Sequence, residues 1–171
     1  MNELTNLAKP ELEKLLQSDV NQLYEELGIR VRAIAADPSK SGSFSPQVAY
    51  NASLMGPLDD LRLFGKEFFN RVNRQAYDLV CGSALTDKKD RAKLEEAFKI
   101  GPTDVAAFLA GLLVIHFGMA AAAAAVVAAL IMKLFFKPGQ EAMCAVWKTK
   151  LPSPAKAEQE SKKPNGGKKK R

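Results

Sequence analysis

Histidine and cysteine are scarce in this 171-residue chain, which has one histidine and two cysteines. The single histidine, His116, excludes a metal centre built from several histidines. Cys81 and Cys144 share no C-x-x-C spacing, which excludes a cysteine-rich zinc module and a disulfide scaffold. Two isolated thiols are typical of a reducing compartment. We therefore predict no metal site and no cofactor.

Other patterns that carry chemistry are absent as well. The chain has neither of the glycine-rich phosphate-binding patterns, G-x-G-x-x-G or G-x-x-x-x-G-K-[ST]. Its paired carboxylates lie on predicted helices, where adjacent residues do not face each other. Residues 1–5 lack the basic and apolar regions of a secretory signal, so we expect a cytosolic N-terminal region. No catalytic group is predicted, and the protein is expected not to be an enzyme.

Charge is distributed very unevenly along the sequence. Residues 1–104 carry 14 Lys/Arg and 16 Asp/Glu, a net charge of −2. Residues 105–132 carry no formal charge, and residues 133–171 carry 11 Lys/Arg and 3 Glu, a net charge of +8. The basic pI of about 9.3 therefore arises from the C-terminal part of the chain.

The apolar periodicity of residues 1–101 predicts an N-terminal helical domain. One amphipathic helix is expected to have Pro10 in its first turn and to end at Gly28, a second to run from near Pro57 to Gly82 or Ser83, and a third from about Thr86 to Lys99. The Ser-rich segment 37–47 is predicted to be a solvated loop. The alternation of residues 29–34 fits a short strand or a continued helix, and we favour the helix. The fold class is therefore all-α, with a small helical bundle.

The uncharged stretch predicts one long apolar helix over residues 103–136. Its 28 uncharged residues would extend about 42 Å as a helix, whereas the hydrocarbon core of a bilayer is about 30 Å thick. This length allows one transmembrane crossing, with the N-terminal domain on the cytoplasmic side. The alternatives are a re-entrant segment, a buried helix, or a hairpin of two short helices broken near Gly118 that is covered by other helices.

Small residues in this stretch suggest a surface for helix packing. Gly111, Gly118 and Ala125 follow each other at seven-residue steps, which favours close approach of a second copy and hence a homo-oligomer. His116 is the only titratable side chain there. It is a candidate pore or gate residue, with a neutral imidazole bonded to a neighbouring helix as the alternative.

The chain after the apolar stretch is basic. Lys133, Lys137 and Trp147 are predicted to anchor the protein at the membrane interface, with a short amphipathic helix over residues 139–151 that could instead dock on the N-terminal bundle. Residues 152–171 are predicted to be a disordered basic tail. Its cationic end could contact an anionic leaflet or bind nucleic acid nonspecifically; it consists of Lys162, Lys163, Lys168, Lys169, Lys170 and Arg171.

These patterns predict a non-enzymatic, membrane-associated helical protein. We expect it to self-assemble through the apolar helix and to perturb or perforate the membrane, under the control of an N-terminal domain that binds a protein partner. Small membrane-acting effectors of bacterial defence share this general layout, as an analogy of architecture only. The alternative is a soluble oligomeric helical adaptor with a basic tail that binds nucleic acid or a protein partner.

Overall fold

The fold is described from a computed structural model, which describes residues 2–82 and 88–152. These residues form an all-α protein, which confirms the all-α part of the predicted fold class. The helices are α1 (Asn2–Leu15), α2 (Val20–Ala36), α3 (Ala52–Met55), α4 (Leu58–Cys81), α5 (Lys88–Ile100), α6 (Pro102–Phe117), α7 (Ala121–Phe135) and α8 (Gln140–Lys150), with a 3-10 helix η1 (Pro38–Gly42).

The first amphipathic segment forms two helices rather than one. Asp19 caps α2 by accepting a hydrogen bond from the backbone N–H of Gln22, whose side chain accepts one in return from the N–H of Asp19. This reciprocal cap separates α1 from α2 and places Gly28 inside α2, not at its end. The undecided segment 29–34 belongs to α2, and the loop predicted for 37–47 contains η1.

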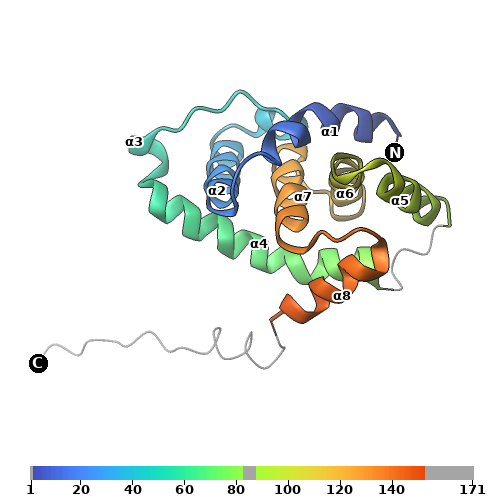
Figure 1. The fold of residues 1–171 in the computed structure, drawn as a ribbon. Coiled ribbons are helices and arrows are strands. Elements are labelled where there is room, and N and C mark those ends of the chain that lie inside the picture. Colours follow the sequence, from blue (N-terminus) through green and yellow to red (C-terminus); the bar gives the residue numbers. More distant parts are fainter. Residues whose placement is uncertain (1, 83–87, 153–171) are drawn as a thin grey trace, which may run out of the picture.

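Helices α6 and α7 lie in the middle of the molecule. Figure 1 shows them between α1 on one side and α4 on the other. Helix α7 contacts α1, α2, α6, α8 and η1, while α6 also contacts α5. The amphipathic helices therefore surround the two apolar ones and turn their polar faces outward.

Two glycines allow α2 and α4 to approach closely. A Cβ atom on Gly65 would lie 1.9 Å from the carbonyl oxygen of Tyr24, and one on Gly28 would lie 2.3 Å from that of Leu61. Neither position has room for a side chain, because the backbones themselves are in contact. Close helix packing through small residues therefore occurs between α2 and α4.

Candidate functional site: the apolar hairpin and its two anchor points

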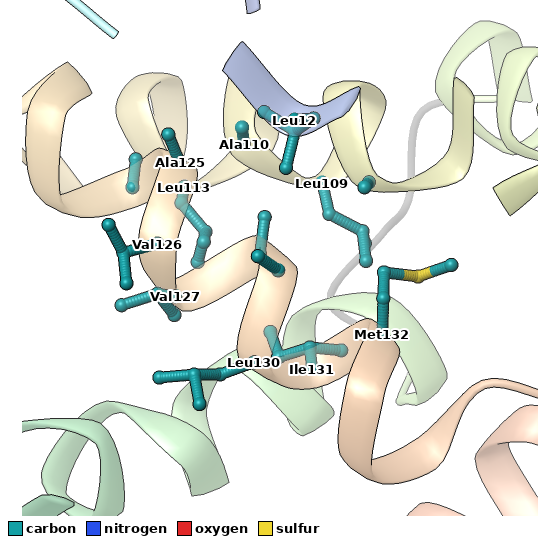
Figure 2. Close-up of a cluster of buried hydrophobic side chains, with 14 of the residues drawn as sticks. Leu12, Leu109, Ala110, Leu113, Ala125, Val126, Val127, Leu130, Ile131 and Met132 are labelled. Atoms are coloured by element: carbon teal, nitrogen blue, oxygen red, sulfur yellow. The ribbon is translucent and has the colours of Figure 1, made fainter. Parts of the chain in front are cut away.

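The apolar stretch forms a hairpin of two helices that the chain itself covers. Every residue of α7 except Lys133 and Leu134 is buried, and α6 is buried from Val105 to Leu113. Figure 2 shows Leu109 and Leu113 of α6 directed toward α7, with Leu12 of α1 above them. Helix α7 is thus apolar on all faces and has neighbours around it, as a helix of this composition requires.

Gly118 produces the break between the two helices. Its backbone is left-handed, with φ 59° and ψ 25°, and its N–H bonds to the carbonyl of Leu113. Glycine adopts this conformation readily, and it commonly ends a helix. The single helix predicted over residues 103–136 is therefore replaced by the hairpin that was its alternative. By the rise per residue, α6 is about 24 Å long and α7 about 22 Å.

Among the described residues, no single helix combines the length and apolar character needed to cross a membrane. Helices α7 and α8 meet these criteria only as a pair, bent by 91° at the break between them.

The N-terminal end of α7 is held by a buried arginine, Arg30 of α2. Its Nη1 donates hydrogen bonds to the carbonyl oxygens of Phe44, at 2.8 Å, and of Ala122, at 3.0 Å. Its Nη2 pairs with the buried carboxylate of Glu11, and its Nε donates to Glu26 at 2.7 Å. We call Arg30, Glu11, Glu26 and the two carbonyls the Arg30 cluster. It joins α1, α2, the segment after η1 and the first turn of α7.

A cavity of about 560 Å³ opens beside this cluster. It lies between α1, the segment after η1 and the turn from α6 to α7, and it shares Phe44 with the Arg30 cluster. The lining side chains are aliphatic, aromatic or serine; the cavity is bounded by Leu4, Leu7, residues 41–45, Val114 and residues 118–121. With no acidic or basic side chain in the lining, the cavity has no group for acid–base chemistry.

The C-terminal end of α7 is held by α8, which is itself attached to α4. Cys81 of α4 and Cys144 of α8 form a disulfide with a Cα–Cα distance of 5.6 Å. The indole N–H of Trp147 donates to the side-chain oxygen of Asn73 at 2.7 Å, and its ring stacks on Phe135 with centroids 5.1 Å apart. We call the disulfide, Trp147, Asn73 and Phe135 the α8 clasp.

The clasp corrects two expectations from the sequence. The cysteines are paired and not isolated thiols, because the fold brings together residues that lie 63 positions apart. Trp147 is fully buried and does not face outward as an interfacial anchor; α8 docks on the bundle, which was the stated alternative. A buried indole needs a partner for its N–H, and Asn73 provides it.

The other predicted site residues are dispersed. Gly111 and Ala125 are buried in different helices, while Gly118 lies in the exposed turn, so they do not form one packing surface on one helix. His116 is exposed at the end of α6. Lys133 and Lys137 are exposed. The tail residues Lys162 to Arg171 lie outside the described residues.

Sequence reasoning missed Arg30 and Glu11, although a signal was present. Arg30 lies seven residues after Leu23 and three after Leu27, on the apolar stripe of α2. Glu11 lies between Ala8 and Leu15 on the buried side of α1. A charged residue on the apolar face of one helix indicates a buried ion pair when a residue of opposite charge lies on the buried face of a neighbouring helix.

The resolved pKa shifts are spread over the molecule and have structural causes. Burial raises the pKa of Tyr24, and the hydrogen bond to Glu25 raises the pKa of Arg62. Hydrogen bonds from the Ser39 hydroxyl and N–H lower the pKa of Asp37 at the start of η1. Within residues 2–82 and 88–152, no group of three His, Cys, Asp or Glu side chains could hold a metal ion.

Comparison with protein-family models, with curated proteins and with solved structures finds no match for this chain. Its function is therefore inferred from its own residues.

Proposed function

We propose that this is a non-enzymatic, membrane-associated helical protein that perturbs a lipid bilayer by transferring its apolar hairpin from the bundle into lipid. One observation carries the proposal: residues 105–132 have no formal charge, and α7 is apolar on every face as far as Met132. A helix that is apolar on all faces is buried either in a protein core or in a membrane. The uniform composition fits lipid as well as it fits the bundle.

The balance of forces supports such a transfer. Lipid tails are as apolar as the side chains that cover α6 and α7, so the buried part of the hairpin avoids water in both settings. The directional contacts that would be broken lie at the start of α6, where Asp104 pairs with Lys9 at 2.5 Å, and at the ends of α7. They include the bond from Arg30 to the Ala122 carbonyl and the bond from Lys150 Nζ to the Leu134 carbonyl at 2.9 Å.

Self-assembly and location are parts of the same proposal. Once outside the bundle, Gly111 and Ala125 would be available for close packing against another copy. Helices α1 to α5 would stay on the side of the membrane from which the hairpin enters and control release, and they could do so in response to a protein partner. His116 would enter the membrane at the leading turn of the hairpin.

Vesicles test the proposal directly. A fluorophore sensitive to polarity is attached at Ile115→Cys, beside the turn, and at Leu54→Cys on α3 as the matched control; both positions are exposed. We expect dye to leak from the vesicles and the probe at position 115, but not that at 54, to report an apolar environment. Absence of leakage, with both probes remaining in water, would refute the proposal.

A second candidate function is a helical adaptor that binds a protein partner. Leu54 is 80% exposed, and Tyr50 and Leu58 are exposed beside it in the chain, around α3. Carbonate extraction separates the two functions, because an adaptor leaves the membrane fraction and an inserted hairpin does not. Replacement of Leu54 by serine should then abolish partner capture without affecting vesicle leakage.

A further inference from the structure

The net positive charge of the chain lies entirely after residue 132. Residues 1–132 carry 14 Lys/Arg and 16 Asp/Glu, whereas the remainder carries 11 Lys/Arg and 3 Glu. Four of these lysines lie in the described part: Lys133 on α7, Lys137 in the turn, and Lys148 and Lys150 on α8. We call these four residues the α7–α8 corner; all of them are exposed.

The corner is held in place by the contacts of α8 with α4. The α8 clasp attaches α8 to α4, and Gln140 adds a hydrogen bond of 3.1 Å to the Val80 carbonyl. Lys150 reaches back to the Leu134 carbonyl, next to Lys133 in the chain. Figure 1 shows α8 running beneath the end of α7. The lysines are therefore presented by a fixed pair of helices that meet at 91°.

Little negative charge opposes these lysines. Within residues 2–82 and 88–152, Lys133, Lys137 and Lys148 form no ion pair. Glu141 is the one acidic residue between positions 133 and 150. Glu95 of α5 borders the same turn, but the described part of α5 has five basic and three acidic residues. The corner therefore attracts anions.

The chain after the corner also carries a net positive charge. Residues 153–171 contain seven Lys/Arg and two Glu, and they follow α8 directly. Ten of the eleven basic residues after position 132 are lysines, which act as point charges and not as the planar forks that recognise single phosphates. The tail has no aromatic residue for stacking on bases.

We propose that the α7–α8 corner is a docking surface for anionic lipid headgroups, which brings the protein to the bilayer surface. Charge complementarity carries this inference, and it rests on the proposed membrane function. The exposed Ile100 lies at the end of α5, beside the start of α6 and hence at the open end of the hairpin, and adds an apolar contact there. Docking weakens as salt screens the lysines.

Vesicle co-sedimentation of the full, disulfide-bonded chain tests the docking surface. The probes are vesicles of phosphatidylcholine alone and vesicles with roughly one third phosphatidylserine. The corner variant replaces Lys133, Lys137, Lys148 and Lys150 by glutamine. The control variant removes the same number of exposed charges from α1 and α4, at Lys14, Lys66, Arg71 and Arg74. Circular dichroism establishes that both variants are folded.

We expect the wild-type chain to bind the anionic vesicles and not the neutral ones. A lysine near an anionic surface contributes about fivefold to binding, so the corner variant should lose at least about tenfold, while the control variant retains wild-type binding. Equal loss in both variants would overturn the docking surface, as would equal binding to both vesicle types. The docking surface would also be overturned if the corner variant lost binding to a short DNA duplex but still bound vesicles as the wild-type chain does. Docking without dye leakage would instead refute the proposed insertion and leave the docking surface standing.

Discussion

The two ends of α7 are held in the bundle by different kinds of contact. At its start, the Arg30 cluster uses a buried ion pair and carbonyl hydrogen bonds to join α1, α2 and the segment after η1. At its end, the α8 clasp uses a covalent bond and a buried indole to attach α8 to α4. Between these ends, α7 has apolar packing alone.

This difference explains how a uniformly apolar helix is kept in one position. Apolar burial stabilises the helix but has no direction, so it does not by itself select one rotation of α7. Hydrogen bonds and a disulfide have narrow geometry and fix the ends. The Arg30 cluster and the α8 clasp should also respond to different treatments, which makes the comparison testable.

Removal of Arg30 should have the largest effect. Arg30→Ala leaves the Glu11 carboxylate buried without its partner, and breaking a buried pair in this way lowers the free energy of unfolding by about 3–5 kcal/mol. Urea denaturation measures the change. Arg74→Ala is the control, because Arg74 is an exposed arginine on α4. If the Arg30 variant lost less than about 1 kcal/mol of unfolding free energy, the Arg30 cluster would not be what holds the start of α7.

Loss of the disulfide should follow in size. Cys81 and Cys144 close a loop of 63 residues that contains α6 and α7, and loss of such a link typically lowers the free energy of unfolding by about 2–4 kcal/mol. Cys81→Ser with Cys144→Ser is compared with the wild-type chain before and after reduction. Hydrogen exchange should increase first in residues 140–150. An unchanged free energy of unfolding on reduction would show that the disulfide does not stabilise the fold.

The hydrogen bond of Trp147 should have a smaller effect. Asn73→Leu removes the acceptor and leaves the indole N–H buried without a partner, which lowers the free energy of unfolding by about 1–3 kcal/mol. Asn70→Leu, at an exposed position on the same helix, is the control. Equal stability of the two variants in urea denaturation would mean that the clasp depends on the disulfide and ring stacking alone.

Replacement of Gly118 should have the smallest effect of the four. Gly118→Ala places a side chain on a left-handed residue at φ 59°, which lowers the free energy of unfolding by about 1–2 kcal/mol. Nothing lies within 4 Å of the added carbon, so the change reflects the backbone alone. Gly42→Ala, also in open space but without a positive φ, should leave thermal denaturation unchanged. A Gly118 variant as stable as this control would contradict the importance of the break.

Local patterns predicted much of the secondary structure. Leu61, Ala76 and Leu79 follow the helical period that defines α4, and Gly82 ends it as expected. The helix expected near residues 139–151 is α8. The apolar periodicity predicts one helix ended by Gly28, whereas the cap at Asp19 separates α1 from α2. In the structure, Gly28 is the place where α4 touches α2.

The site was less predictable, because its members come from distant parts of the chain. Arg30 meets a carbonyl 92 positions away, and Asn73 meets an indole 74 positions away. No local spacing encodes such a pairing. Gly111, Gly118 and Ala125 are a regular spacing that does not form a site. Seven-residue steps place residues on one face only in a continuous helix, and the left-handed turn at Gly118 interrupts that helix.

Periodicity, hydropathy and charge are local properties, so the amino-acid sequence was enough to predict a helical chain, an apolar segment without charge over residues 105–132 and the excess positive charge after it. How that segment is covered depends on the tertiary structure. It folded the segment back at Gly118, enclosed it with the chain's own amphipathic helices and joined Cys81 to Cys144, because such contacts depend on which surfaces meet in space and not on which residues are neighbours in the chain.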